Sequence, residues 1–448
     1  MIPRCLTRLA RLAVCAILVP WAAQGVAGAQ APRAAVPAPV QGETTDEDGL
    51  EVFLVTFGQG ELVFERFGHN AIWVHDATAG TDSTYDWGNF SFRQPGFLRR
   101  FLTGDTRYSM EGKDANEMVD FYRRLGRTIT LQRLNLTAAQ KGSLRDDLRR
   151  NALDENKFYR YDYFVDNCST RLRDALDRTV GGALRVATDS IRTPLSYRRE
   201  SVRLTDGDRP IQTGIDIALG RPADVPLSVW ESFFIPMRLR DAVRDVTVPN
   251  GAGGARAPLV TSERTIEPYP GTPRVVELQT APRLVWRLLL VGVVLAALVA
   301  GIRIMAVSRR GAVWGLALVT SVWSLLCGLI GVILVLAWTA TKHVFWAWNE
   351  NLFLVSPLSL LLAVLLPMAL LRRRAEGAAR RVALAVVALG LVGLVLSLLP
   401  GGQENRAIVA LFLPVHLAIA WSVVRPALAA ARAPRRVSPG VQDDGARI

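Results

Sequence analysis

Hydrophobic and polar residues follow three successive patterns along this chain. Between residues 49 and 76 apolar and polar side chains largely alternate, with many β-branched and aromatic residues, which is typical of β-strands. In segments 115–125, 137–153 and 168–180 apolar residues recur three or four positions apart, as on one face of a helix. From residue 284 long apolar runs take over. The pattern predicts an α+β domain followed by an all-α, polytopic membrane domain.

The apolar runs predict five transmembrane helices, because each run is close to or above the ~18 residues that a span needs. They cover residues 284–302, 313–338, 352–371, 382–399 and 407–424. Arginines cluster after the first, third and fifth runs. The positive-inside rule places those loops in the cytoplasm, so residues 30–283 and the loops near 340–351 and 400–406 face outside.

The N-terminus has the pattern of a secretory signal. Three arginines precede a short apolar run at residues 12–23, and small residues follow at 27–29. We expect cleavage near Ala29, with an uncleaved anchor as the alternative. The predicted organisation is a signal peptide (1–29), a disordered leader (30–48), an exported catalytic domain (49–248), a linker (249–283), a five-helix membrane domain (284–424) and a cytoplasmic tail (425–448).

The net charge of +13 follows from this topology, since many arginines lie in the cytoplasmic loops. An exported domain is a poor candidate for nucleic-acid binding. We therefore expect no nucleic-acid partner and a lipid bilayer around the C-terminal third.

The exported part carries a single thiol, Cys168, although an oxidising compartment favours paired cysteines. Cys168 follows Asp166 and Asn167, either of which is a good N-cap for the predicted helix. Unpaired backbone N–H groups and the helix dipole at that position favour the thiolate, and the Cys168 N–H can help to bind an oxyanion. The alternative is a small buried hydrophobic residue.

A thiol nucleophile needs a base, and the chain has four histidines. His416 lies in the last apolar run and is expected to be structural. His69 and His75 lie six residues apart, on the same face of a regular strand, where either could instead serve packing. Two histidines and one cysteine without compact spacing do not build a zinc site, so we predict no metal and no cofactor.

Several motifs resemble a known family. They are ERFGHNAIWV, YDWGNFSF, YRYDYFVDNCSTRLRD and DIALGRPAD in the exported part, and NENLFLVSPL in the membrane part. Together they are similar to Lnb, a family linked to lipoprotein N-acylation in bacteria. The resemblance implies that Cys168 and His69 form the catalytic pair. The order of histidine before cysteine resembles circularly permuted papain-like (NlpC/P60-like) enzymes, including acyltransferases that use phospholipids.

The resemblance implies an enzyme of the bacterial inner membrane with its catalytic domain in the periplasm. It would move an acyl chain from a membrane phospholipid to the α-amine of an apolipoprotein's lipid-modified N-terminal cysteine, through a Cys168 thioester. Further candidate residues fall into two groups. Those expected to orient His69 or line the oxyanion site are Asn70, Asp86 and Asn167. Those expected to position substrate are His343, Asn349 and Glu350, in a loop whose aromatic residues also suit a membrane interface.

Two other functions stay open at this point. A periplasmic thiol hydrolase, acting on cell-wall peptide or lipid ester, would use the same cysteine and histidine but release its acyl group to water. A non-catalytic envelope assembly protein would use Cys168 only for packing.

Overall fold

The computed structural model describes residues 49–249, 256–277 and 280–424. The chain divides into two compact units, residues 1–43 and 44–448, and every described residue belongs to the second. The segments predicted as signal peptide, leader and cytoplasmic tail lie outside the described residues.

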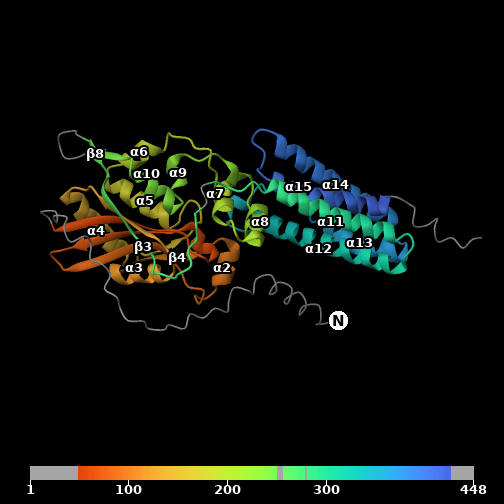
Figure 1. Ribbon diagram of the computed structural model, residues 1–448, viewed down its shortest axis with the longest axis horizontal. Helices are drawn as coiled ribbons and strands as arrows, with labels where there is room; N and C mark the ends of the chain where they lie inside the picture. Colours follow the sequence, from red (N-terminus) through yellow and green to blue (C-terminus); the bar gives the residue numbers. More distant parts are fainter. Residues whose placement is uncertain (1–48, 250–255, 278–279, 425–448) are drawn as a thin grey trace, which may run out of the picture. The chain divides into compact units, whose positions relative to one another are not determined.

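A seven-stranded antiparallel sheet forms the centre of the N-terminal domain (Figure 1), with strand order β6-β4-β3-β2-β1-β5-β9. The central strands β1 and β2 pair along their whole length, from Leu50 opposite Asp76 to Phe57 opposite His69. The strands are β1 Leu50–Phe57, β2 His69–Asp76, β3 Thr81–Asn89, β4 Arg107–Asp114, β5 Ile129–Leu134, β6 Phe158–Arg160 and β9 Val260–Ile266. The predicted strands of 49–76 are therefore confirmed as β1 and β2.

Helices cover both faces of the sheet. Leu172 and Leu176 of α5 pack with Ile72 and Met110 in the main hydrophobic core, together with residues of α4. On the other face Tyr122 of α3 stacks on Phe57. Because side chains alternate along a strand, this arrangement places the odd-numbered residues of β2 on the α3 side. The helices are η1 Val63–Phe67, α2 Phe97–Thr103, α3 Ala115–Arg124, α4 Ala138–Asn151, α5 Cys168–Thr179, α6 Ala183–Thr188, α7 Tyr197–Leu204, α8 Arg209–Ala218, η2 Arg221–Asp224, α9 Val229–Ser232 and α10 Pro236–Val243.

The segment expected to be a linker contributes to the fold. β7 Thr247–Pro249 and β8 Arg256–Pro258 form a two-stranded hairpin, and β9 extends the main sheet by pairing with β5. β9 is an edge strand with mostly polar and charged side chains, of which only Ile266 is buried. Charge on an edge strand discourages intermolecular pairing, but it also hides the apolar alternation that identifies a strand in sequence.

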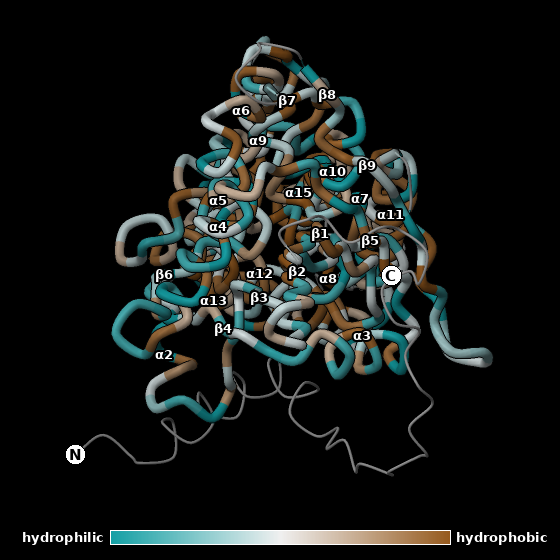
Figure 2. The backbone as a smooth tube through the Cα atoms, turned by 90° about the vertical axis from the view of Figure 1, so that its left-hand side faces the viewer, coloured by the Kyte–Doolittle hydropathy of each residue, from teal (hydrophilic) through white to brown (hydrophobic). Residues whose placement is uncertain are grey.

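In the described part of the chain, five α-helices follow: α11 Val285–Met305, α12 Arg310–Ala340, α13 Ser359–Arg372, α14 Glu376–Leu398 and α15 Arg406–Val424. Two short 3₁₀ helices, η3 Val344–Trp346 and η4 Glu350–Phe353, lie between α12 and α13. Four of these α-helices are long and apolar enough to cross a membrane, whereas α13 is shorter. Figure 2 colours the chain by hydropathy and shows brown, hydrophobic tube around the labels of α12 and α15.

The third apolar run differs from expectation, because its helix begins at Ser359 and not near 352. The fourteen residues of α13 span about 21 Å, less than the ~30 Å hydrocarbon core. The chain before α13 is irregular but buried at Leu354 and Val355, and His416 Nε2 donates to the Leu354 carbonyl over 2.8 Å. Irregular backbone at membrane depth is tolerated when other helices bury it and satisfy its polar groups.

Polar side chains join two loops between the long apolar helices to the N-terminal domain. Asn349 Nδ2 donates to the Ile217 and Ala218 carbonyls at 2.9 Å each, and Asn351 Nδ2 donates to Ile217 at 3.0 Å. Gln403 Nε2 donates to the Leu219 carbonyl at 3.1 Å. These three side chains are buried, so the hydrogen bonds fix the end of α8 against the two loops.

Candidate active site

His69 is the first residue of β2 and lies on the α3 side of the sheet. It follows Gly68, whose φ of 79° places it in the left-handed region that favours glycine. A Cβ on Gly68 would also lie 2.5 Å from the Met237 sulfur. The glycine therefore lets the chain turn into β2 in a crowded position and present the imidazole at the end of the strand.

Cys168 is the first residue of α5, as predicted, and its side chain is partly exposed. Asn167 is the N-cap, and its Oδ1 accepts the Ser169 and Thr170 N–H groups at 2.9 Å each. Ser169 is fully buried, and its hydroxyl donates to the Phe233 carbonyl. The capped helix and the buried serine hold the first turn of α5 in one position, and with it the thiol.

Gly88 allows the thiol to reach the histidine. It lies in β3 with φ 94°, where the β3–β4 register shifts, and a Cβ on it would lie 3.3 Å from the Cβ of Cys168. That separation is tighter than ordinary side-chain contacts. A glycine is required there because the N-terminus of α5 comes up against the backbone of β3.

The His69 imidazole lies between an acid and the thiol. Its Nε2 is 2.8 Å from Asp86 Oδ2, and the imidazole lies near enough to Cys168 for the charge of that side chain to raise the pKa of His69. Since Asp86 engages Nε2, the other ring nitrogen, Nδ1, is the one left for the thiol. Asp86 is buried and is held by Lys113 Nζ at 3.2 Å and by Asn89 Nδ2 at 3.2 Å. The three functional groups thus form a Cys–His–Asp arrangement in which each residue orients the next.

The electrostatics favour a charged pair. Burial alone would lower the pKa of His69, but the negative charge of Cys168 and the hydrogen bonds to Asp86 and Cys168 raise it to about 9. Burial would raise the pKa of Asp86, yet the hydrogen bond to His69 and the charges of His69 and Lys113 hold it below its usual value. These shifts favour a protonated His69 paired with an ionised Asp86 at neutral pH.

The comparisons with known proteins agree with this architecture. The family model of the Lnb N-terminal periplasmic domain matches residues 40–200, and that of the Lnb transmembrane domain matches residues 283–426. This chain belongs to the Lnb family. It is therefore a membrane protein with a periplasmic domain. Neither the curated proteins nor the solved structures gave a match, so the permuted papain-like resemblance stays a prediction.

The other residues predicted for the periplasmic site of this Lnb protein differ in their placement. Asn70 is fully buried beside α5, and its Nδ2 lies 3.4 Å from Ser169 Oγ. The amide group of Asn167 donates to the Tyr163 and Phe234 carbonyls, so this side chain is occupied in capping and anchoring α5. His75 pairs with Asp82 at 2.9 Å, at the far end of β2 from His69.

Of the loop residues predicted to position substrate, His343 and Asn349 contact the periplasmic domain, whereas Glu350 contacts Gln403 in the next loop of the membrane domain. His343 Nε2 donates to the Phe101 carbonyl at 3.1 Å, and burial lowers the pKa of this histidine. Asn349 binds the end of α8, and Glu350 Oε2 accepts the Gln403 backbone N–H at 3.0 Å. The hydrogen bonds of these three side chains hold the loop between α12 and α13 in place. A role in placing the acceptor amine stays a prediction.

Three residues of the Lnb site were missed in the sequence. Gly88 and Asn89 stand in the quoted YDWGNFSF motif, directly after Asp86, but nothing in their spacing indicated the approach of α5. Lys113 comes from β4, and only the pairing of β3 with β4 brings it to Asp86. In the part of the chain that the structure describes, no group of His, Cys, Asp and Glu side chains could hold a metal ion.

We expect Gly88→Ala to lower the reactivity of Cys168 by about tenfold or more, because the new methyl group displaces the thiol from His69. The measurement is the rate of alkylation of Cys168 by iodoacetamide at neutral pH in the full-length protein. Gly80→Ala is the matched control, since Gly80 also has a positive φ, 63°, but open space around it. Equal alkylation rates in wild type and Gly88→Ala would contradict the proposed packing of α5 on β3.

The raised pKa of His69 makes stability depend on pH. The folded protein binds this proton more tightly than the unfolded chain, whose histidine has a pKa near 6.5. The interactions of protonated His69 therefore contribute fully to the free energy of unfolding below about pH 6.5. This contribution is lost as the pH rises through about 9. We expect the difference in melting temperature between wild type and His69→Gln to shrink across this interval. A difference that stays constant would mean that His69 is neutral throughout.

Proposed function

We propose that this protein is a lipoprotein N-acyltransferase of the bacterial inner membrane that works through a Cys168 thioester. The observation that supports it most is the His69 imidazole, held by Asp86 at 2.8 Å and near enough to Cys168 for the charge of that residue to raise its pKa, in a domain fastened to the loops between membrane helices. Lnb family membership adds the link to lipoprotein biogenesis. Its donor is a membrane phospholipid, and its acceptor is the α-amine of a lipid-modified N-terminal cysteine.

In the first half-reaction the Cys168 thiolate attacks an ester carbonyl of the phospholipid. The backbone N–H of Cys168, at the first position of α5, can donate to the developing oxyanion. The C–O bond then breaks, and the His69 imidazolium protonates the departing alkoxide, so that a lysophospholipid leaves. The products are an acyl-thioester on Cys168 and a neutral His69.

Acylation also prepares the second half-reaction. The charge of Cys168 is the largest influence that raises the pKa of His69, and a thioester carries no such charge. The acylated enzyme therefore has a less basic His69, which stays neutral and can accept a proton from the acceptor's α-amine. The amine attacks the thioester, an amide bond forms, the C–S bond breaks, and the thiolate and imidazolium return.

The attachment to the membrane domain explains how the catalytic groups reach substrates that are anchored in the bilayer. Both substrates are anchored in the bilayer by acyl chains, so a catalytic domain held at a fixed height meets them without extracting either. The hydrogen bonds of Asn349 and Gln403 to α8 provide that fixed attachment. Replacing either residue should loosen the periplasmic domain without touching the reacting groups.

The acceptor test separates transfer from hydrolysis. Purified full-length protein is loaded from phospholipid and then given a peptide with a diacylglyceryl-cysteine N-terminus, or the same peptide with its amine blocked. We expect the acyl chain to appear on the free amine, while the blocked peptide stays unmodified, as followed by mass spectrometry. Release of free fatty acid at the same rate with both peptides would instead favour the hydrolase reading and contradict the transferase.

A further inference from the structure

The segment around α2 exposes apolar side chains beside arginines. Phe92, Leu98, Phe101 and Leu102 are each at least half exposed, and Arg93 and Arg99 lie between them. Scattered apolar residues are normal on a surface, but a contiguous group rimmed by cations is typical of a surface that meets a membrane or another molecule.

The contacts of α2 attach this segment to the end of a helix that is long and apolar enough to cross a membrane. The Lys342 backbone N–H donates to the Thr103 carbonyl at 2.8 Å, and Lys342 Nζ pairs with Asp105 at 2.7 Å. Lys342 is only two residues beyond the end of α12 at Ala340. The apolar group on α2 is therefore fastened to the external end of a membrane-spanning helix, where the lipid headgroups lie.

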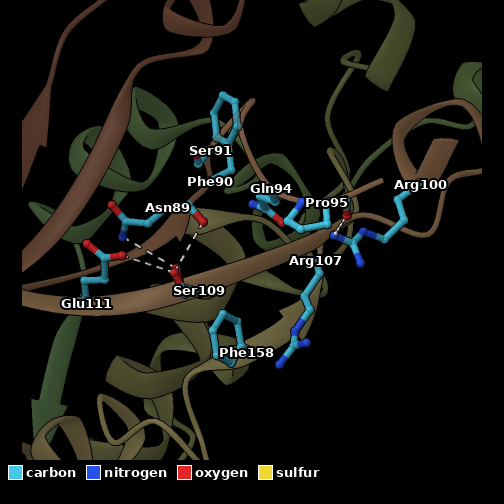
Figure 3. Close-up of a pocket in the computed structure, with 10 residues that line it drawn as sticks. All are labelled: Asn89, Phe90, Ser91, Gln94, Pro95, Arg100, Arg107, Ser109, Glu111 and Phe158. Carbon is cyan, nitrogen blue, oxygen red and sulfur yellow. Dashed lines mark hydrogen bonds between the residues drawn. The ribbon is translucent and has the colours of Figure 1, made fainter. Parts of the chain in front are cut away.

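A cavity of about 480 Å³ opens beside α2. Figure 3 shows Arg100 and Arg107 toward one side of it and Glu111 on the opposite side. The Arg107 guanidinium lies 4.0 Å from the centre of the Phe158 ring, and Arg100 donates to the Pro95 carbonyl. Among the described residues, neither arginine forms an ion pair with a carboxylate, whereas Glu111 pairs with Lys113 at 3.6 Å. The cavity thus combines the apolar side chains of Phe90, Pro95 and Phe158 with two guanidinium groups that no carboxylate among the described residues neutralises by an ion pair.

The cavity is also connected to the candidate active site. Asn89 lines it and donates to Asp86 Oδ1, the carboxylate that holds His69. From Phe90, another lining residue, stacked rings lead inward: Phe90 on Tyr108 with centroids 4.9 Å apart, and Tyr108 on Tyr161 at 4.2 Å. Tyr161 lies beside Gly88, where Cys168 also packs. A row of packed aromatic rings therefore separates the cavity from the thiol, with Phe90 at one end and Cys168 at the other.

We propose that this cavity is the binding site for the phospholipid donor. Arg100 and Arg107 hold the lipid phosphate, because guanidinium groups match phosphate oxygens in geometry and charge. The exposed residues of α2 dip into the outer layer of the bilayer, and the phosphate held in the cavity keeps the ester of the same lipid on the Asn89 side, next to Asp86 and His69. The inference rests on the proposed function in one respect, that the donor is a phospholipid.

Kinetics and binding test the phosphate site separately. In the first experiment, full-length protein in mixed micelles receives dioleoylphosphatidylethanolamine or dioleoylglycerol, which lacks the phosphate, and the rate of Cys168 acylation is measured. In the second, the full-length Cys168→Ala variant is titrated with dihexanoylphosphatidylethanolamine by calorimetry. The second experiment needs no turnover, so it separates failure of the phosphate site from failure of the proposed chemistry.

We expect Arg100→Gln and Arg107→Gln each to raise the KM for the phospholipid and weaken the calorimetric affinity by about tenfold or more. The maximal acylation rate should change little, and acylation by dioleoylglycerol should not change. Arg149→Gln, which removes an exposed arginine from α4, is the matched control and should behave as wild type. Wild-type KM and affinity in both cavity variants would overturn the proposal.

A further variant tests the membrane contact of α2. Leu98→Ser/Leu102→Ser removes two exposed side chains, so the fold of the domain should be unaffected. We expect slower acylation from long-chain phospholipid in bilayer nanodiscs but an unchanged rate with micellar short-chain phospholipid. Unchanged rates with both lipids would show that α2 does not guide the donor from the bilayer.

Discussion

Replacing Cys168 by alanine is expected to abolish N-acylation of lipoproteins, with a loss of about a thousandfold or more. Without the thiol there is no nucleophile to carry the acyl chain, and no other described cysteine can replace it, because Cys327 is buried among membrane helices. The measurement is mass spectrometry of lipoprotein N-termini from cells that express wild-type or variant protein. The variant should fold, since removal of one partly exposed sulfur at a helix start costs far less than a core cavity.

Two controls make that result specific. Cys327→Ala removes the thiol in the membrane domain and should leave N-acylation intact. Cys168→Ser keeps the size of the side chain but replaces the sulfur with a much weaker nucleophile, so it should be as inactive as Cys168→Ala. Normal N-acylation in Cys168→Ser would favour a non-catalytic assembly protein in which this residue only packs.

Replacing His69 by alanine is expected to slow formation of the acyl-enzyme by about 10²–10⁴-fold, the usual contribution of a positioned general base or acid. The variant loses both the partner of the thiolate and the proton donor for the leaving lysophospholipid. Asp86→Asn should also slow the reaction, since it removes the charge that orients and supports the His69 imidazolium. Single-turnover acylation of Cys168 by phospholipid measures both effects.

The pH dependence of the acylation rate tests whether Asp86 supports the charge of His69 or only packs beside it. In Asp86→Asn the pKa of His69 should fall, because the charge and the charged hydrogen-bond acceptor that raise it are gone. The upper limb of the pH–rate profile should then move to lower pH. His75→Gln is the matched control, since His75 pairs with Asp82 and not with the site. An unshifted profile in Asp86→Asn would mean that Asp86 only packs.

Local patterns in the sequence were sufficient for much of the site. Alternation between residues 49 and 76 indicated β1 and β2, and therefore the face shared by His69 and His75. Asn167 and the apolar spacing after it indicated the start of α5 at Cys168, because capping and amphipathicity are properties of neighbouring residues. The start of α4 has a local signal of the same kind, because Thr137 forms a capping box with Gln140.

Features that depend on distant pairing were not accessible in this way. Lys113 reaches Asp86 only through the register of β3 and β4, and the charged strand β9 has no apolar alternation to reveal it. Packing against a distant residue also explains why α13 begins at Ser359 and not near residue 352, where the apolar run starts. Gly331 of α12 would place a Cβ 1.9 Å from the Val355 carbonyl oxygen, so the irregular chain fits there only against a glycine. Hydropathy counts apolar residues but does not register such an approach.

The central claim is that the enzyme passes through an acyl-thioester on Cys168. It is tested most directly by incubating purified full-length protein with phospholipid in the absence of any amine acceptor and analysing the intact chain and its peptides by mass spectrometry. We predict one fatty acyl chain on the peptide that contains Cys168, removed by hydroxylamine as a thioester is, and absent from Cys168→Ala. Absence of any adduct in wild type, together with N-acylation that persists in Cys168→Ala, would contradict the account.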